Sequence, residues 1–324
     1  MPFCRLFVLI FSLSIYLSIN PVAAAEKIRF GLNWLPEGEH CGFFQAKAAG
    51  LYKKAGLDVE LKSGGPDLNT PLLVSTGQLD LALGTSFTTL NMVEEGIPGV
   101  TVAAFFQKDP QTLVAHPGQG VSTLPDVKGR PVMISSNARQ EFWQFLKLKF
   151  GFTDDQLRPY VYSAAPFLAD PKAIQQGYVT EDAFLRGEEA TKPLVILLLA
   201  DYGFDNYTTT IFGLKGFLEK NQRAVRAFVA ATREGYEACM AGDYGAGMKL
   251  LLSMNPDHGE PLFHFKLKEM KARGLVDGGD AERFGVGVMT DERWKSFFET
   301  MAEAGVYPKS LDYKSAYSLE FIQK

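Results

Sequence analysis

The stretch that decides the fold runs Gly31-Leu-Asn-Trp-Leu-Pro-Glu-Gly-Glu-His-Cys-Gly-Phe-Phe44. Polar and apolar residues alternate over 27–32, which predicts a strand that ends where this stretch begins. A proline and two glycines then break the alternation, and apolar residues at helical spacing follow. Trp34, Glu39 and His40 therefore lie on a loop at the carboxyl end of a first strand, where open α/β sheets hold their ligands. An ordinary strand-to-helix loop with a half-buried Trp is the alternative.

Upstream of this stretch, the pattern of residues 1–25 is typical of a secretory signal peptide. One basic residue, Arg5, precedes an apolar run over 6–19, and three alanines at 23–25 supply a cleavage site. The run is shorter than the roughly 20 apolar residues that a membrane span needs. No Cys follows the cleavage site, so we expect a free, exported mature chain without a lipid anchor.

Composition narrows the class of protein. The chain has 324 residues, 33 Lys+Arg and 37 Asp+Glu, and a net charge of −4. This acidic balance gives no support for nucleic-acid binding, and the length fits one large domain or two smaller ones. Cys41 and Cys239 remain after cleavage; they form no zinc motif. A single disulfide between them is possible in an oxidising compartment, and the sequence leaves that question open.

Strands and helices alternate downstream, which predicts a parallel sheet. The first series of strands is predicted over 57–61, 79–84 and 100–106, with helices over 68–76, capped by Asp67, and over 87–95. A second series has strands over 131–134, 158–162, 176–181 and 194–200 and helices over 138–150, 167–175 and 182–186. A strand over 208–214 and helices over 219–241, 246–253, 260–273 and 290–304 complete the chain. We therefore expect an α/β protein with two lobes.

Several short motifs occur together in this chain. They are Leu32-Asn-Trp34, Glu39-His40, Gly50-Leu-Tyr with Gly56-Leu-Asp-Val59, Gly64-Gly65, Gly77 with Asp80, and Gln176-Gly-Tyr-Val-Thr-Glu181. In this combination the chain resembles periplasmic substrate-binding proteins of ABC importers, in the branch for thiamine-pyrimidine precursors. That branch includes the fungal pyrimidine-synthesising enzymes and lies near the sulfonate- and nitrate-binding proteins. The resemblance extends over about 27–241.

The resemblance implies a two-lobed periplasmic-binding-protein fold of type II, with two crossovers and mixed, mostly parallel sheets flanked by helices. We expect residues 26–112 and 213–324 to form lobe 1 and residues 113–212 to form lobe 2. A ligand would bind between the lobes, and the crossovers near Leu113 and Thr209 would act as hinges.

The resemblance also assigns roles to residues at matching positions. It implies that Trp34 and Tyr178 line a flat ring, that Glu181 accepts hydrogen bonds from its polar edge, and that His40 lies beside it. Glu39 is a second candidate acceptor. Core packing is the alternative for the two aromatic residues, and a carboxylate at a helix start is the alternative for the two glutamates.

Turns that follow strands supply the remaining candidate binding residues. Gly64, Ser86 and Ser136 lie where free backbone N–H groups can meet a ligand. Arg139 follows Ser136 at the start of a predicted helix, so its guanidinium could join those donors in binding a phosphate or carboxylate. A solvated arginine is the alternative.

The sequence contains no sign of catalysis. It has no G-x-S-x-G, Walker or G-x-G-x-x-G motif and no metal-ligand spacing. His116, His258 and His264 are expected at the surface. We therefore expect no catalytic residue, no metal and no cofactor. An enzyme on the same fold is the alternative, although the resemblance associates the enzyme members with a clustered cysteine motif that this chain lacks.

The expected function is uptake of a thiamine pyrimidine precursor, of the hydroxymethylpyrimidine or formylaminopyrimidine type. The expected partners are this small heteroaromatic solute and an ABC permease and ATPase at the membrane, with no nucleic acid, for a monomer in the periplasm. Another flat heteroaromatic such as riboflavin, or an alkanesulfonate, is the alternative ligand. The loop around Glu37 and Glu39 is richer in acidic residues than a binding site for a sulfonate or nitrate should tolerate.

The signal-peptide hypothesis has a direct test. Protein secreted by a bacterial host should begin at or near Glu26 when its N-terminus is sequenced, because cleavage follows the three alanines. Folded protein in the exported fraction that still begins at Met1 would contradict it.

Overall fold

The computed structural model describes residues 25–65, 68–160, 162–182 and 193–322. The expected signal peptide, apart from its last residue, lies outside the described residues, as do Asp67 and nearly all of the helix expected over 182–186. Among the described residues, no helix is long and apolar enough to span a membrane.

The first of two sheets is built around the N-terminal strand. Its strand order is β2-β1-β3-β10-β4. The strands are β1 (Glu26–Gly31), β2 (Leu57–Lys62), β3 (Leu81–Gly84), β4 (Gly99–Phe106) and β10 (Thr208–Leu214). β1 runs parallel to β2 and β3, whereas β10 runs antiparallel to β3 and β4. Every residue of β4 is buried, as expected of a strand in a sheet that is covered on both faces.

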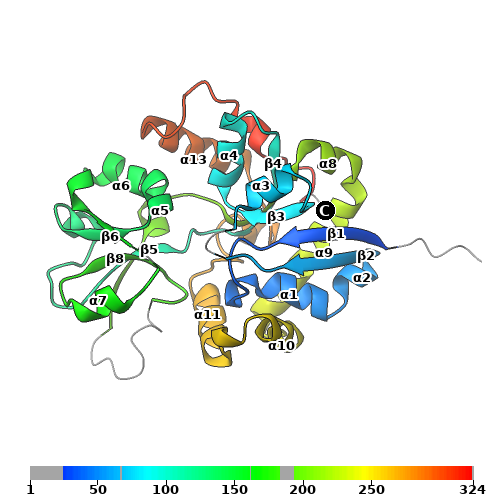
Figure 1. Ribbon diagram of the computed structural model, residues 1–324, viewed down its shortest axis with the longest axis horizontal. Helices are drawn as coiled ribbons and strands as arrows, with labels where there is room; N and C mark the ends of the chain where they lie inside the picture. The colour runs from blue at the N-terminus through cyan, green and yellow to red at the C-terminus, as the bar shows by residue number, and fades with distance from the viewer. Residues whose placement is uncertain (1–24, 66–67, 161, 183–192, 323–324) are drawn as a thin grey trace, which may run out of the picture.

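Helices from both ends of the chain flank this sheet, on the right of Figure 1. They are α1 (Cys41–Ala48), α2 (Leu51–Lys54), α3 (Thr70–Ser75), α4 (Ser86–Glu94), α8 (Lys215–Lys220) and α9 (Gln222–Ala241). Stacked aromatic rings hold α1 and α9 on the sheet. The ring centroids of Phe43 and Phe30 lie 4.7 Å apart, as do those of Tyr236 and Phe105.

The second sheet has the order β7-β6-β8-β5-β9. Its strands are β5 (Gln111–Ala115), β6 (Val132–Ile134), β7 (Leu157–Pro159), β8 (Ile174–Tyr178) and β9 (Val195–Leu198). It is also mixed, because β6 runs parallel to β7 and β8 while β5 runs antiparallel to β8 and β9. The accompanying helices are α5 (Ser136–Gln140), α6 (Phe142–Phe150) and α7 (Ala165–Ala169). Figure 1 shows this part in green on the left.

The C-terminal region is helical, as predicted. It contains α10 (Gly245–Met254), α11 (Glu260–Ala272), α12 (Ala281–Phe284) and α13 (Asp291–Glu303). Short 3₁₀ turns connect the elements of the chain; they include η1 (Gly38–His40), η5 (Leu199–Tyr202) and η6 (Pro256–His258). In Figure 1, α11 lies near the boundary between the two sheets.

The chain crosses between the sheets twice, after β4 and before β10. Asp109 lies on the first crossover and Asn206 on the second, and both are buried. Asn206 Nδ2 donates to Asp109 Oδ2 at 2.8 Å, so the two crossovers are joined side by side. The chain enters the second sheet at Gln111, where β5 begins, and returns to the first sheet at Thr208, where β10 begins. Both points lie slightly before the lobe boundaries predicted at residues 113 and 213. The division into two lobes remains a proposal, with its edges at these crossovers.

Two predicted helices and one predicted helix cap differ most from the structure. The helix predicted over 167–175 is wrong, because α7 ends at Ala169 and β8 begins at Ile174. The sequence of β8 lacks clear alternation, and a tertiary hydrogen bond from Ser135 N to Gln176 Oε1 offsets the burial of Gln176. The helix predicted over 138–150 is interrupted at Glu141, whose φ and ψ are both −108°. The cap of α3 is Asn69, which accepts from Leu72 N at 3.0 Å.

A disulfide joins Cys41 at the start of α1 to Cys239 near the end of α9, across 198 residues of sequence. Both cysteines are buried. The sequence left this pairing open because nothing local to either residue indicates its partner. The bond fastens the first helix of the chain to the long helix that covers the same sheet.

The disulfide should contribute to stability. Replacing both cysteines, Cys41→Ser with Cys239→Ser, should lower the free energy of unfolding by about 2–5 kcal/mol, because the bond restricts the unfolded chain. Urea denaturation with and without reductant measures this, and the double variant is the control because reductant has nothing to cleave in it. A parent protein whose stability is unchanged after verified reduction would contradict the prediction.

Candidate functional site

A lysine is buried where the two halves of the molecule meet. We call the first sheet with its helices and the C-terminal region the first half, and the second sheet with its helices the second half. Lys266 lies on α11 with no exposed surface. Its Nζ lies 3.0 Å from Glu37 Oε2, 2.8 Å from Glu39 Oε1 and 2.6 Å from Glu181 Oε1. Glu37 and Glu39 follow the first strand of the first sheet, whereas Glu181 follows β8 of the second sheet. We call these four side chains the Lys266 cluster.

The loop after β1 positions the first two glutamates. Glu37 N donates to His40 Nδ1 at 3.2 Å, which closes the 3₁₀ turn η1. Gly38 N donates to His258 Nε2 at 3.1 Å, and a Cβ at Gly38 would lie 2.8 Å from Lys266 Cβ, so only glycine lets the loop approach α11 this closely. Tyr236 on α9 donates its hydroxyl to Glu39 O at 2.8 Å, which fixes the turn from its other side.

A tight turn after β8 positions the third glutamate. Glu181 N donates to Tyr178 O at 2.8 Å. The buried side chain of Asp182 accepts from Tyr178 N at 2.9 Å and from Thr112 Oγ1 at 2.6 Å, which fastens the turn to β5. Thr180 in the same turn donates its hydroxyl to Glu39 Oε1. The turn therefore contacts the first half through both Glu181 and Thr180.

Charge and burial set the ionisation of the cluster. Burial alone would lower the pKa of Lys266, but the carboxylates of Glu39, Glu37 and Glu181 outweigh it and raise the pKa. Burial also opposes ionisation of Glu39, but Lys266 and the hydrogen bond from Thr180 overcome it and lower the pKa of Glu39. Burial raises the pKa of Glu37 to about 8, with help from the neighbouring Glu39. Glu37 therefore carries a proton at neutral pH, and one ammonium faces two carboxylates.

Aromatic side chains from both halves accompany these acids. The rings of Trp34, from the loop after β1, and Tyr162, from the second half, lie 5.6 Å apart with 42° between their planes. Tyr162 is exposed and has a φ of 56°, an uncommon backbone conformation for an aromatic residue. Tyr160 lies 5.5 Å from Tyr162, ring to ring. Burial, then the charge of Glu181, raises the pKa of Tyr160 to about 12.

Tyr178 lies among the same acids. The residue ends β8 and is half-buried. Burial raises the pKa of its phenol well above the ordinary value, and the carboxylates of Asp109, Glu39, Glu37 and Glu181 raise it further. The structure thus brings together Glu39, Tyr178 and Glu181 of the predicted site, although Glu181 is held by an ammonium that the sequence did not predict. Trp34 contacts Tyr162 instead.

The other predicted binding residues have local structural contacts. His40 is buried with its Nδ1 in the 3₁₀ turn, and burial lowers its pKa to about 4. Gly64 N donates to Trp34 O at 3.0 Å, and a Cβ there would lie 2.4 Å from Leu32 O, so this glycine supports the Trp34 loop. Ser86 is buried, and its hydroxyl accepts from Tyr207 N at 3.1 Å.

Ser136 and Arg139 lie on the short helix α5. Ser136 is exposed, while Ser135 caps the helix by accepting from Ala138 N at 3.3 Å. Arg139 is half-buried, and its buried Nε has no hydrogen-bond partner among the described residues. No contact in the described structure joins either residue to the Lys266 cluster.

Lys266 and His258 were missed by the sequence interpretation. His258 and His116 were expected at the surface, but both are buried; burial lowers the pKa of His258 to about 4. The sequence pattern that could have indicated a buried Lys266 is its position among Phe263, Leu267 and Met270, which form the buried side of α11. A lysine within the apolar stripe of an amphipathic helix needs a buried partner.

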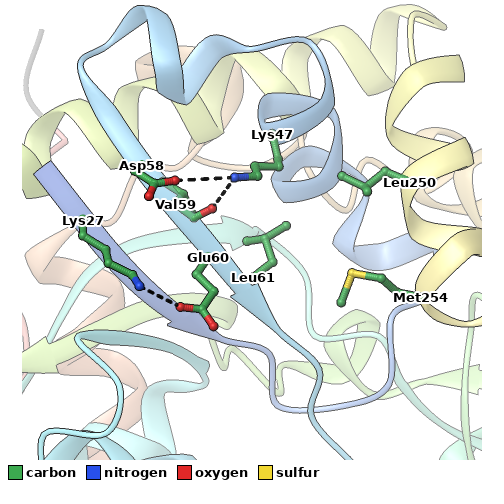
Figure 2. A pocket seen from close by; sticks show the side chains of 8 residues that line it. All are labelled: Lys27, Lys47, Asp58, Val59, Glu60, Leu61, Leu250 and Met254. Atoms are coloured by element: carbon green, nitrogen blue, oxygen red, sulfur yellow. Dashed lines mark hydrogen bonds and ion pairs between the residues drawn. The ribbon is translucent and has the colours of Figure 1, made fainter. Parts of the chain in front are cut away.

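A separate depression lies on the outer side of the first sheet, with a volume of about 410 Å³ (Figure 2). It is lined by Lys27, Lys47, Asp58, Val59, Glu60, Leu61, Leu250 and Met254. Its charges are paired, since Lys47 Nζ lies 4.0 Å from Asp58 Oδ1 and Lys27 Nζ lies 3.4 Å from Glu60 Oε2. It contains none of the predicted site residues. Within the described part of the chain, no group of His, Cys, Asp and Glu could hold a metal ion.

Comparison with known proteins assigns the family. The family model described as NMT1/THI5 like matches residues 37–243, which include η1, β8 and every described strand except β1. The chain belongs to the NMT1/THI5 like family.

Relatives of this NMT1/THI5 like protein include enzymes and binding proteins. It is 24% identical over 237 residues to the 4-amino-5-hydroxymethyl-2-methylpyrimidine phosphate synthase THI11 of Saccharomyces cerevisiae, covering 67% of this chain and 68% of that one. It is 21% identical over 314 residues to the riboflavin-binding protein RibY of Chloroflexus aurantiacus, covering 94% and 88%.

A solved structure identifies the fold. The periplasmic aliphatic sulphonate-binding protein SsuA of Escherichia coli superimposes with a TM-score of 0.65 at 15% identity, covering 90% of this chain and 91% of that one. The NMT1/THI5 like protein therefore has the periplasmic-binding-protein fold that the resemblance implied.

Glu37 should make stability depend on pH. Its folded-state pKa is raised, so the folded protein binds a proton that the unfolded chain releases between about pH 4.5 and 8, and its contribution to stability falls as pH rises through that window. Glu37→Gln should therefore gain stability relative to the parent between pH 5 and 8, on the order of 1–3 kcal/mol. Urea denaturation across that range measures the gain.

The exposed Glu303→Gln is the matched control for this pH series. Its stability should follow that of the parent protein at every pH. A difference between Glu37→Gln and the parent that stays constant from pH 5 to 8 would show that Glu37 does not titrate in this window.

Proposed function

We propose that this protein is the solute-binding component of an ABC importer and that it binds a thiamine pyrimidine precursor, of the hydroxymethylpyrimidine or formylaminopyrimidine type, between its two lobes. The observation that carries the proposal is the Lys266 cluster. It gathers carboxylates from both halves of the chain at one place, beside aromatic rings that also come from both halves.

The charge of the cluster favours a solute that donates hydrogen bonds. An ammonium group has three N–H donors, and Lys266 directs them to the carboxyl groups of Glu37, Glu39 and Glu181, of which Glu37 is protonated at neutral pH. No donor of Lys266 is left for an anion, and the excess of carboxylate repels one. An aminopyrimidine instead offers N–H donors at its edge. A sulfonate is therefore the less suitable ligand, even though the fold resembles that of SsuA.

The aromatic residues favour a flat solute. Trp34 and Tyr162 approach each other from the two halves, and Tyr178 lies among the acids. Stacking on such rings contributes about 0.5–1.5 kcal/mol beyond the burial of area. Trp34 follows β1, Tyr162 follows β7 and Tyr178 ends β8, and strand ends are where α/β folds commonly bind small molecules. Riboflavin, another flat ring system and the ligand named for RibY, is the second candidate.

The location and partners follow from the same proposal. We expect the mature protein to be exported to the periplasm as a monomer and to deliver its solute to a membrane permease driven by an ATPase. The resemblance to SsuA supports this expectation. The disulfide between Cys41 and Cys239 also supports it, because disulfides persist in oxidising compartments.

An enzyme is the competing class, because THI11 is a pyrimidine phosphate synthase. Against this stands the cysteine content of the described chain, where Cys41 and Cys239 are joined in a disulfide and offer no free thiol. Incubation with candidate solutes followed by mass spectrometry distinguishes the classes, since a binding protein returns its solute unchanged. A new product that depends on the protein would favour the enzyme.

Binding should depend on residues from both halves. Glu181→Gln should weaken binding of 4-amino-5-hydroxymethyl-2-methylpyrimidine about 10- to 100-fold, because a hydrogen bond to a charged acceptor contributes about 1.5–3 kcal/mol. Trp34→Ala should weaken it by a similar or larger factor through lost burial and stacking. Isothermal titration calorimetry measures both, with Glu303→Gln expected to bind like the parent.

The same titrations separate the alternative ligands. An alkanesulfonate would bind more tightly to Glu181→Gln, because the substitution removes a repulsive charge. Equal affinity of Glu181→Gln and the parent protein for the aminopyrimidine would refute the role of Glu181.

A further inference from the structure

We propose that Lys266 is a positioning residue of the solute site: its ammonium holds Glu39 and Glu181 together and leaves one oxygen of Glu39 free to accept an N–H group of the solute. This inference rests on the proposed function and goes beyond it, because it names the group that sets the selectivity for an amine. Lys266 itself does not contact the solute in this arrangement, since the carboxyl groups of Glu37, Glu39 and Glu181 accept its three donors.

The first observation is the unequal use of the two Glu39 oxygens. Oε1 accepts from Lys266 Nζ at 2.8 Å and also from the hydroxyl of Thr180. Oε2 is buried and has no hydrogen-bond partner among the described residues. A buried carboxylate oxygen without a partner is costly. A solute that brings an N–H donor to Oε2 removes this cost, whereas a solute without one leaves it in place.

The second observation is that, within the described residues, Lys266 is the cation among the titratable groups that surround Glu39. The others come from the first loop, the turn after β8, η6 and α9. They are Glu37, His40, Tyr178, Glu181, Tyr236 and His258. The two histidines are neutral at pH 7 because burial lowers the pKa of each to about 4. The charge of Glu39 therefore depends on Lys266.

Removing the ammonium should change the chemistry of Glu39. Without Lys266, burial and the neighbouring carboxylate of Glu181 both favour the protonated acid at neutral pH. A protonated Glu39 presents a donor as well as an acceptor, so it no longer prefers an amine. Raising the pH restores the carboxylate and with it the preference. A lysine that served only to hold α11 in place would produce no such pH dependence.

The experiment compares two probes by calorimetry. One is 4-amino-5-hydroxymethyl-2-methylpyrimidine, and the other is the same molecule without its 4-amino group. The parent protein should prefer the amine about 10- to 100-fold at pH 7, 8 and 9.5, the factor expected of one hydrogen bond to a charged acceptor. Lys266→Met should lose this preference at pH 7 and regain part of it at pH 9.5. Lys268→Met, an exposed lysine on the same helix, should behave like the parent.

Two outcomes of this experiment overturn the inference. One is a Lys266→Met protein that keeps the preference of the parent at pH 7. The other is a loss of preference that is the same at every pH, which would indicate a purely structural role.

A second measurement uses the parent protein without solute, so it also covers a Lys266→Met variant that does not fold. Carboxyl ¹³C NMR should show Glu39 ionised from neutral pH down to below its ordinary pKa of about 4.5. Titration of Glu39 above that value overturns the role of Lys266. If the parent binds neither probe, the proposed function fails. This NMR titration still tests separately whether Lys266 keeps Glu39 ionised.

Discussion

The burial of Lys266 constrains the whole arrangement of this protein. An ammonium group removed from water costs several kcal/mol even after the surroundings relax, so it must meet opposite charge. The carboxylates that meet it lie on two different sheets, at the ends of β1 and β8. The relative position of the two halves is therefore tied to the electrostatics of one side chain. Glycine at position 38 is part of the same constraint, because a Cβ there would collide with Lys266.

The crossovers provide a second tie between the halves, of a different kind. The hydrogen bond between Asp109 and Asn206 joins the two segments at which the chain changes sheets. In the proposed two-lobe arrangement the crossovers are the hinges, so this bond lies close to the proposed pivot, whereas the Lys266 cluster joins residues that follow β1 and β8. A bond near a pivot moves little when two bodies rotate, while bonds at the opposing edges must break. The Asp109–Asn206 hydrogen bond would therefore persist while the proposed lobes rotate, whereas the ion pair between Lys266 and Glu181 would have to break.

Much of the fold was predictable from the sequence, because β1, β2, β4 and β10 carry alternating or continuous apolar residues. β8 was not, since one of its two buried glutamines, Gln176, is accommodated by a tertiary hydrogen bond that local periodicity cannot reveal. The candidate site divides in the same way. Trp34, Glu39 and Glu181 follow strands and were predicted, but Lys266 was not, because its partners Glu39 and Glu181 lie 227 and 85 residues away along the chain. The pairing of Cys41 with Cys239 stayed open for the same reason.

The disulfide between Cys41 and Cys239 has a topological consequence. The covalent ring that it closes contains all five described strands of the second sheet and both crossovers. A single backbone cut anywhere within this ring would leave the two pieces linked, so the fragments would separate only after reduction. α11 lies outside the ring, while Glu181 lies within it. The ion pair between Lys266 and Glu181 therefore joins the C-terminal region, outside the covalent ring, to a residue inside it.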